Sequence, residues 1–508
     1  MNIKRAKEEI EHTIRAYLAK DEHGDYRIPI VSQRPILLMG PPGIGKTAIM
    51  EQVARACNLA LVSYTMTHHT RQSAIGLPYI LKKKYGGKEY SVTEYTMSEI
   101  IASVYDKMEE TGLHEGILFI DEINCVSETL APTMLQFLQG KTFGSHRVPD
   151  GWIIVAAGNP PEYNKSVREF DVVTLDRLKK IDVQADFAAW KEYAYAQSVH
   201  GAILSYLEIK KEHFYQIQTT IDGKVFATAR GWEDLSKLIQ TYEALDIPVD
   251  QDVVYQYIQH RTIAKDFANY LELYAKYKQD YHIDAILDGQ LDEALSLKLK
   301  MAPFDEKLSV IGLLLSKLNE QFQEYDRVDR FVSQLYEVLK GLKTPLLCEE
   351  NRQTPTPDIL KQVLAERTKA FEQRKKAALL DKLEERCEQQ VLQTLESYTK
   401  TVQAEHLGGH EEAFTLIKDL FELEVEHRQE VIERTANQLE HAFDFMEAAF
   451  GESQEMVVFI TELTVNFFSA KFLNEHECER YYRYNKGLLF GERQRGILKE
   501  IDEIQGAL

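Results

Sequence analysis

A glycine-rich segment at residues 40–47 constrains the fold of this chain more than any other part of the sequence. It lies between an apolar run at 36–39 and a helical pattern at 48–57, and its spacing is Gly-x-x-x-x-Gly-Lys-Thr. Glycines at this spacing let backbone N–H groups turn inward around phosphate oxygens, and the helix that follows presents its positive end to the same place. The segment consists of Gly40, Pro41, Pro42, Gly43, Ile44, Gly45, Lys46 and Thr47. The sequence therefore predicts a phosphate-binding loop.

Two side chains of this loop have separate predicted roles. Lys46 places a positive charge beside the β- and γ-phosphates of a nucleotide, and the Thr47 hydroxyl is a ligand for Mg²⁺. The Asn-Lys-x-Asp pattern that would favour guanine is missing, because Asn164-Lys165-Ser166 is followed by Val167. We therefore expect the substrate to be ATP with Mg²⁺.

Apolar runs elsewhere in the first third of the chain predict the strands of one parallel sheet. These runs lie at 36–39, 59–62, 117–120, 153–157 and, more weakly, 181–183. The third and fourth lack apolar–polar alternation, as expected for strands that helices cover on both faces. The order strand, glycine loop, helix, strand is the opening βαβ unit of such a sheet. We therefore predict an α/β domain over residues 1–185.

The run at 117–120 ends in the acidic pair Asp121-Glu122. Ligands of open α/β sheets gather at the carboxyl ends of the strands, so the two carboxylates are expected beside the phosphate loop. Asp121 is predicted to hold Mg²⁺ through water. Glu122 is predicted to orient and deprotonate the attacking water, which is the role of a general base.

Three further polar residues are candidates for the same site. Asn159 follows the run at 153–157, where its amide can bind the γ-phosphate and position the water; the alternative is a turn-forming Asn-Pro pair. Arg177 lies between that run and the strand at 181–183, and Arg230 opens a predicted helix at 229–245. Taken alone, either arginine could equally be an ordinary surface residue.

Two hairpins are predicted to be inserted into the α/β domain. The first joins 79–85 to 88–95 through Gly86-Gly87, a good signal for a two-residue turn. Its three lysines at 82–84 are interpreted as a solvated strand edge that discourages aggregation. The second hairpin spans 140–151, directly before the strand at 153–157. The alternative for each segment is an ordinary surface loop.

Together these residues resemble the MoxR branch of the AAA+ ATPases, over roughly residues 20–265. The resemblance rests on MGPPGIGKT, LFIDEI, AAGNPPEYN, LDRL and ARGWEDL, in that order, and on the two hairpins. It implies that Asn159 and Arg230 are the two sensors of the γ-phosphate. It also implies that Arg177 is the finger that completes a neighbouring subunit's site, with Arg168 as a second candidate for that contact.

The resemblance also implies partners. Relatives in this branch form rings, usually of six subunits, with ATP at each junction. They act as chaperones that mature enzymes or insert metal cofactors, commonly together with a protein that carries a von Willebrand A domain. We therefore expect this chain to assemble with itself and to remodel a client protein.

The predicted fold is an α/β P-loop AAA+ core, a parallel sheet with helices on both faces, followed by a helical lid and a largely α-helical C-terminal half. From residue 186 onward the pattern is almost wholly helical, with packed helices at 186–206 and 229–245. The predicted divisions are 1–185 for the core, 186–270 for the lid, 271–344 for a helical region, 345–357 for a proline-containing linker and 358–508 for a C-terminal helical domain. Residues beyond 270 match no pattern with a known role; we expect them to dock a client or partner, the alternative being that they only stabilise the ring.

Composition narrows the class of protein. The net charge of -20 disfavours a nucleic-acid partner, because such binding draws most of its affinity from basic surface. The five cysteines are scattered, which argues against a disulfide framework. The most apolar stretch, 456–473, is interrupted by polar residues, so it predicts a buried helix and no membrane span. A reducing cytoplasm is the expected location.

Two other function classes stay open. A nucleic-acid motor is the main alternative, since helicases and a restriction GTPase share similar hairpin insertions and the first hairpin carries lysines. A regulatory switch that binds ATP without turning it over is the other. Glu122 argues against the switch, because a switch needs no base.

Overall fold

The computed structural model describes residues 1–66, 76–127, 130–143, 146–163, 170–221, 223–347, 354–405, 407, 409–487 of the chain. The described chain forms two compact units. The first consists of Met1–Ala189 with Ala365–Arg386, and the second of Trp190–Leu364 with Cys387–Leu508.

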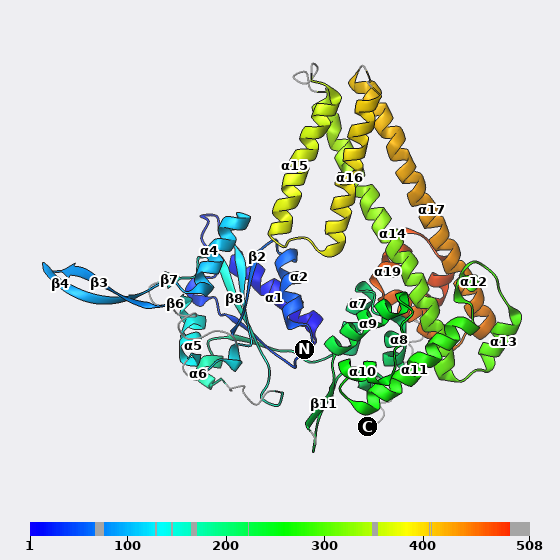
Figure 1. Cartoon of the computed structure of the whole chain (residues 1–508), viewed down its shortest axis with the longest axis horizontal. Helices are drawn as coiled ribbons and strands as arrows, with labels where there is room; N and C mark the ends of the chain where they lie inside the picture. The colour runs from blue at the N-terminus through cyan, green and yellow to red at the C-terminus, as the bar shows by residue number, and fades with distance from the viewer. Residues whose placement is uncertain are drawn as a thin grey trace, which may run out of the picture. The chain divides into compact units, whose positions relative to one another are not determined.

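The first unit is built on a five-stranded parallel sheet in the order β2-β5-β8-β1-β9. The strands are β1 (Ile36–Met39), β2 (Ala60–Thr65), β5 (Gly116–Asp121), β8 (Trp152–Gly158) and β9 (Lys179–Asp182). Helices α1 (Ile3–Leu18) and α2 (Lys46–Ala56) cover one face of the sheet, and α4 (Glu99–Thr111) and α5 (Ala131–Gly140) cover the other (Figure 1). All five predicted strands and the two-faced cover are confirmed.

Both faces of the central strands are buried, which explains their continuous apolar sequence. On one face Leu37, Leu118 and Ile154 belong to the core cluster that also contains Ile101 of α4 and Phe137 of α5. The alternate residues of the same strands, such as Phe119, are equally buried on the opposite face. Every strand residue from 116 to 120 and from 152 to 158 is therefore removed from water.

Both predicted hairpins are present. The first pairs β3 (Pro78–Tyr85) with β4 (Lys88–Tyr95) through Gly86 and Gly87, which have φ angles of 56° and 80°. Positive φ at both turn positions is the conformation that a tight two-residue hairpin requires, and glycine adopts it without strain. This ribbon projects from the sheet (Figure 1). The second hairpin pairs β6 (Thr142–Phe143) with β7 (His146–Arg147), and its tip lies outside the described residues.

A buried lysine lies at the base of the second hairpin. Lys141 is 7% exposed, and its Nζ is 3.4 Å from the Trp152 carbonyl oxygen and 3.5 Å from Gln33 Oε1. Both distances are long for hydrogen bonds to an ammonium group. Burial, reinforced by Arg147 and opposed by Asp150, lowers the pKa of Lys141 from 10.5 to about 8. The fold therefore disfavours the protonated form of this side chain.

We predict that Lys141→Met stabilises the protein at pH 7. Below pH 8 the lysine is protonated in both the folded and the unfolded chain, and the fold carries the full cost of about 3 kcal/mol that the lowered pKa implies. As pH rises from 8 to 10.5 the folded protein releases its proton first, so this cost disappears. The thermal midpoint of the variant should therefore exceed that of the wild type at pH 7 and approach it near pH 10.5. The exposed Lys180→Met serves as the control; equal effects of both variants at pH 7 would contradict the prediction.

The second unit is mainly helical, as predicted, and long helices dominate it (Figure 1). Its helices are α7 (Phe187–Ala196), α8 (Gly201–Ile209), α9 (Ala229–Ala244), α10 (Gln251–Tyr257), α11 (Arg261–Asp280), α12 (Ile283–Leu287), α13 (Glu293–Met301), α14 (Phe304–Leu347), α15 (Thr356–Lys376), α16 (Lys382–Ala404), α17 (His410–Phe450), α18 (Gln454–Val465) and α19 (Phe467–Glu475). Parts of α15 and α16 belong to the first unit. The middle of the predicted linker, residues 348–353, lies outside the described residues.

The prediction of one helix over 186–206 is wrong. The chain leaves α7 at Ser198, which has a φ of 54°, and the Val199 N–H donates back to the Ala194 carbonyl in a helix-ending turn. The His200 side chain then accepts from the Ala202 N–H and begins α8. Local polar capping therefore divides an apolar pattern that continues across the break.

The prediction that the chain is almost wholly helical after 186 also missed a hairpin. Strands β10 (Gln216–Thr220) and β11 (Gly223–Ala227) pair antiparallel just before α9. The signal was present as a short alternation of apolar and polar residues followed by Asp222-Gly223, a common turn pair. A ten-residue pattern inside a long helical region was too short to outweigh its surroundings.

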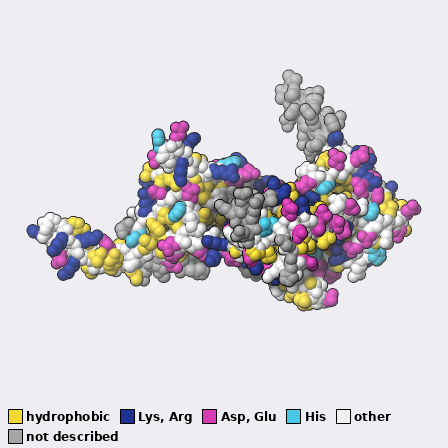
Figure 2. Space-filling view, turned by 90° about the horizontal axis from the view of Figure 1, so that it is seen from above, with side chains coloured by type: hydrophobic (Ala, Val, Ile, Leu, Met, Phe, Trp, Pro, Cys, Tyr) yellow, Lys and Arg dark blue, Asp and Glu magenta, His cyan; other side chains and the backbone are white. Residues whose placement is uncertain are grey.

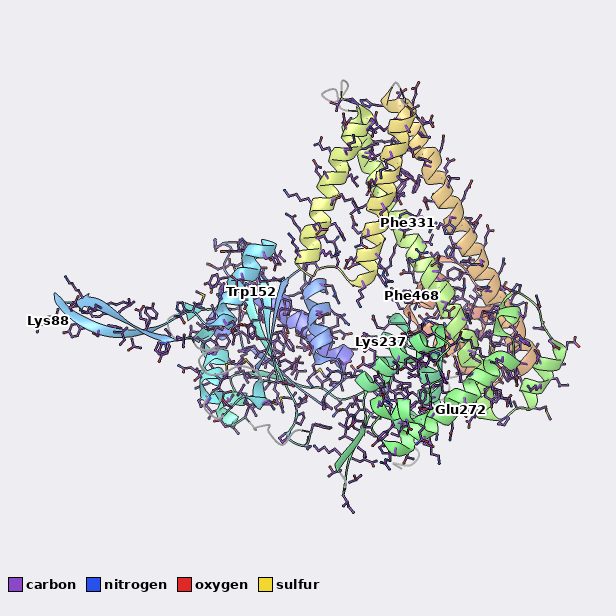
Figure 3. The ribbon with its side chains drawn as sticks, in the orientation of Figure 1. Lys88, Trp152, Lys237, Glu272, Phe331 and Phe468 are labelled. Atoms are coloured by element: carbon purple, nitrogen blue, oxygen red, sulfur yellow. The ribbon has the colours of Figure 1, made fainter. Side chains whose placement is uncertain are left out.

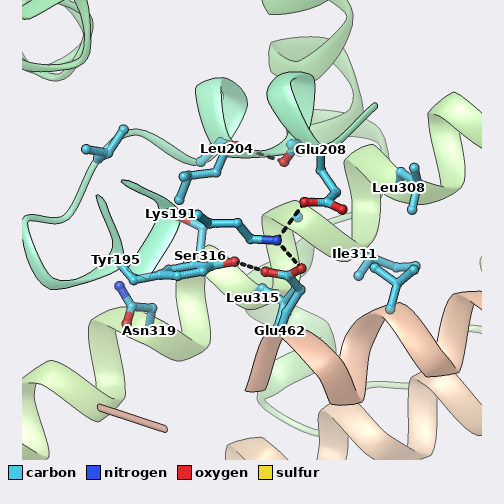
Figure 4. Close-up of a pocket in the computed structure, with 15 residues that line it drawn as sticks. Lys191, Tyr195, Leu204, Glu208, Leu308, Ile311, Leu315, Ser316, Asn319 and Glu462 are labelled. Carbon is cyan, nitrogen blue, oxygen red and sulfur yellow. Dashed lines mark hydrogen bonds and ion pairs between the residues drawn. The ribbon is translucent and has the colours of Figure 1, made fainter. Parts of the chain in front are cut away.

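A buried charged cluster joins distant segments of the second unit (Figure 4). Lys191 on α7 forms ion pairs with Glu208 of α8 and Glu462 of α18. The Tyr195 hydroxyl donates to the other oxygen of Glu462 at 2.5 Å, and burial raises the pKa of that hydroxyl. Removing one member of such a buried pair leaves an uncompensated charge. The helices of the predicted lid therefore share one packed core with helices from the end of the chain.

One face of the apolar stretch at 456–473 is buried, but the single helix predicted there is wrong. Asn466 ends α18, and its side chain accepts from the Phe468 N–H to begin α19, with a bend of 86° between the two helices. Within the described residues, no single helix is long and apolar enough to cross a membrane; only this bent pair reaches that length and composition when taken together.

Candidate nucleotide site

The predicted phosphate loop connects the end of β1 to the start of α2. Gly43 and Gly45 have φ angles of 74° and 90°, which side-chain-bearing residues rarely adopt, and Gly45 is the N-cap residue directly before α2. At Gly40 a Cβ would lie 2.8 Å from the Val183 carbonyl oxygen, so only glycine fits beside β9. The loop therefore has the turned backbone and the free helix N-terminus that bind phosphate.

Lys46 is almost buried, at 8% exposure, and its ammonium group points back across the loop. It donates to the carbonyl oxygens of Gly40 and Pro41 and to Asn159 Oδ1, each at 2.8 Å. These three acceptors are neutral oxygens, so an incoming phosphate would supply a negative charge to a lysine that is already positioned. A desolvated cation of this kind interacts strongly with anions.

Thr47 and Asp121 meet across the first turn of α2 and the end of β5. The Thr47 hydroxyl donates to Asp121 Oδ2 at 2.9 Å, and the Glu122 N–H donates to Asp121 Oδ1 at 2.9 Å. A hydroxyl and a carboxylate side by side are the hard oxygen donors that Mg²⁺ prefers, with water and phosphate completing its coordination. Thr47 and Asp121 therefore fit the predicted magnesium role and would hold the ion against the phosphates.

Glu122 has a left-handed backbone, with φ of 55° and ψ of 36°. A non-glycine residue in this region is strained, and such strain concentrates at functional sites. The turn places Glu122 immediately beyond the sheet edge, half-exposed, at the start of the 3₁₀ turn Ile123–Cys125. Among the described residues, no group donates a hydrogen bond to its carboxylate, which leaves it available to accept a proton from water.

Asn159 follows β8, the strand that lies between β5 and β1. The register pairs Met39 with Gly158, so the residues after both strands, Gly40 and Asn159, reach the same edge. A residue that sequence reasoning missed, Asn124, hydrogen-bonds the backbone of Asn159 on both sides. Its signal was its position two residues after Glu122, although a lone Asn carries little information without the fold.

The structure does not test the roles predicted for the three candidate arginines. Arg177 is exposed, and its Nη1 donates to Gln139 Oε1 on α5 at 2.7 Å. Arg230 is exposed in the first turn of α9, in the second unit. Arg168 lies outside the described residues. The predicted roles of all three stay predictions.

Comparison with known families places this site in a class. Residues 35–178 match the AAA domain family, in its dynein-related subfamily. The matched range contains the loop, the Asp121-Glu122 pair, Asn159 and Arg177. A search of the curated proteins found no match to the chain. The first unit thus contains an AAA domain, which implies nucleotide binding and ATP-dependent activity.

We predict that Lys46→Ala removes tight binding of ATP. The variant loses a desolvated charge that opposes the phosphates, and charge-assisted hydrogen bonds of this kind contribute enough to lower affinity by roughly 10- to 100-fold. Calorimetric titration with Mg-ATP measures the change, with the exposed Lys180→Ala as the control. If the Lys46→Ala variant binds Mg-ATP with wild-type affinity, the loop is not part of the nucleotide site.

Proposed function

We propose that this chain is a Mg²⁺-dependent ATPase that hydrolyses ATP to ADP and phosphate at the edge of its parallel sheet. The observation that carries the proposal is the convergence of two hydrogen-bonded pairs, Lys46 with Asn159 and Thr47 with Asp121, on the carboxyl ends of β1, β5 and β8. Each pair joins residues more than 70 positions apart in the sequence. Such convergence is what phosphoryl transfer needs, since its catalysis is mainly positioning and charge stabilisation.

Each residue then has a distinct task in the proposed reaction. The loop backbone and Lys46 hold the phosphates, while Thr47 and Asp121 would hold Mg²⁺, which would neutralise charge on the phosphate oxygens. The Glu122 carboxylate orients a water molecule and accepts its proton as the water attacks the γ-phosphorus. Asn159 binds the γ-phosphate and keeps that water in line.

We predict that Glu122→Gln binds ATP but hydrolyses it roughly 100-fold or more slowly than the wild type, the scale of a lost general base. Binding is retained because Lys46, Thr47 and Asp121 are unchanged. Phosphate release and calorimetric affinity are measured on the same preparation, with Glu115→Gln on the same domain surface as the control. Hydrolysis by Glu122→Gln at the wild-type rate would show that another group is the base.

The proposal extends to a ring, usually of six subunits in the MoxR branch of AAA+ ATPases that the motifs resemble. Arg177 is exposed, and its guanidinium donates to Gln139 on α5, which suits a surface residue that serves a neighbour. Head-to-tail contacts that close into a ring would place one subunit's finger at the next subunit's nucleotide. Arg230 is proposed to touch the γ-phosphate from the lid helix α9.

We predict that Arg177→Ala lowers turnover by about 10³-fold, the scale of a lost arginine finger. Mixing this variant with Lys46→Ala should restore part of the activity, because a mixed junction pairs an intact loop with an intact arginine. Sedimentation confirms that both variants still assemble. If assembled mixtures stay inactive, the finger does not act in trans, and Arg168 becomes the candidate for separate replacement.

The work proposed for this ATPase is remodelling of a client protein, as chaperones of the MoxR branch do when they mature enzymes or insert metal cofactors with a von Willebrand A protein. The β3–β4 ribbon supports this proposal, because it exposes several apolar side chains on a projecting hairpin (Figure 2). One of its faces carries the exposed side chains of Tyr79, Leu81, Tyr85 and Tyr90. Exposed apolar patches of this kind mark interaction surfaces.

A nucleic-acid motor is the second candidate, and the same ribbon favours it. The ribbon carries four lysines at positions 82, 83, 84 and 88 against two glutamates at 89 and 94, and Lys88 lies at its tip (Figure 3). Aromatic and basic side chains together are suited to single strands. The chain's net charge of -20 opposes this reading. Oligonucleotide binding that weakens steeply with salt would favour the motor over the chaperone.

A further inference from the structure

Asn124 occupies a buried position between the two strands that carry the proposed chemistry. It lies in the 3₁₀ turn Ile123–Cys125, two residues beyond Glu122, and its side chain is 2% exposed. Burying an amide is unfavourable unless its donors and acceptor find partners. The position of Asn124 therefore depends on the groups that its amide meets.

Those groups are the two backbone atoms of Asn159. Asn124 Nδ2 donates to the Asn159 carbonyl oxygen at 2.8 Å, and Asn124 Oδ1 accepts from the Asn159 N–H at 3.3 Å. A backbone carbonyl only accepts and a backbone N–H only donates, so the orientation of the amide is unambiguous. The pair of bonds holds residue 159 on both sides and thereby sets the direction of its side chain.

The neighbouring Gly158 makes room for this contact. A Cβ at residue 158 would lie 2.6 Å from Asn124 Oδ1, closer than real Cβ atoms approach an oxygen. Gly158 has an ordinary strand conformation, so its missing side chain is explained by this close approach and not by backbone strain. The last residue of β8 and the turn after β5 are therefore fitted to each other.

The amide of Asn159 continues the connection into the loop, because its Oδ1 accepts from Lys46 Nζ at 2.8 Å. One hydrogen-bonded path thus runs from the turn behind Glu122, through the backbone and side chain of Asn159, to the lysine of the phosphate loop. Displacements of about 1 Å in such an arrangement can cost roughly 100-fold in rate.

We propose that Asn124 is a positioning residue for ATP hydrolysis: it touches no reacting atom, and it fixes Asn159 relative to Lys46 and to the water beside Glu122. This inference rests on the proposed ATPase function. It predicts that the effect of Asn124 on turnover passes through Asn159, and that little of it concerns the binding of ATP.

The first test is a double-mutant cycle on turnover. Asn124→Ala should lower kcat by roughly 10- to 100-fold while the Kd for Mg-ATP stays close to the wild-type value. In an Asn159→Ala background, the Asn124→Ala replacement should have little further effect, because the group it positions is gone. Additive losses in the double variant would show that Asn124 does not act through Asn159, and would overturn the proposal.

A second experiment tests the same contact by replacing Gly158 at the end of β8. Gly158→Ala should push Asn124 Oδ1 away and reproduce the loss in kcat. Combined with Asn124→Ala, it should cost little more than Asn124→Ala alone, because the oxygen that the new methyl group meets is no longer present. A double variant much slower than either single variant would contradict the fitted contact.

The control is Asn319→Ala in the second unit. Asn319 Oδ1 accepts from Asn466 Nδ2 at 2.7 Å, so this change also breaks a buried amide bond, but far along the chain from the loop. It should lower the thermal midpoint without changing kcat. If the Asn319→Ala and Asn124→Ala variants lose kcat equally, Asn124 only stabilises the fold and has no positioning role.

Amide hydrogen exchange separates this proposal from the proposed function. In Asn124→Ala the N–H of Asn159 should exchange faster, while the N–H groups within β8 keep their protection. If the wild-type protein hydrolyses no ATP, the ATPase proposal fails, and this measurement still decides whether Asn124 holds Asn159. Unchanged exchange at residue 159 would overturn the positioning role.

Discussion

The hydrogen bond from Lys46 to Asn159 is the interaction on which the nucleotide site depends. It joins the first residue of α2 to the residue after β8, and it can form only because β1 and β8 are paired in the register that sets Met39 opposite Gly158. The N–H of Gly40 donates to the Gly158 carbonyl oxygen, and the Gly40 carbonyl oxygen accepts from the Lys46 ammonium group. The sheet is therefore both the core of the first unit and the frame that sets the distances in the site.

The second unit depends on a different kind of constraint. Lys191 is placed between two carboxylates, and one of them, Glu462, comes from a helix 271 positions later in the chain. Further along the same bundle, Lys471 of α19 bridges Asp326 and Asp329 of α14 at 3.0 and 2.7 Å. Buried charges of this type are costly unless every partner is present, so they select one arrangement of helices. Helices α14, α18 and α19 are thus built into the same core as the predicted lid, which favours a stabilising role for these three helices.

Sequence reasoning succeeded where local pattern and tertiary role coincide. The strands, the phosphate loop and the hairpin at Gly86-Gly87 were predicted because continuous apolar runs, fixed glycine spacing and a two-glycine turn each have one common structural meaning. It failed where a short local signal competed with a long pattern. The break at Ser198 lies in a segment whose composition suits helix, and the β10–β11 ribbon is a short strand pattern inside a long helical region. The bend at Asn466 depends on one side-chain cap.

The sequence alone determined the glycine loop and the acidic pair, and it predicted a nucleotide-binding chemistry for them. Gly40, Lys46, Thr47, Asp121 and Glu122 are recognised by type and spacing, and their positions at strand ends follow from the apolar runs before them. Only the tertiary structure decided the role open to Asn124. The role of Asn124 cannot be inferred before β5 and β8 are known to lie side by side, because its partners are the backbone atoms of Asn159, 35 positions away. Every residue except proline carries the same backbone N–H and C=O groups, so no sequence pattern indicates which of them a side chain will meet.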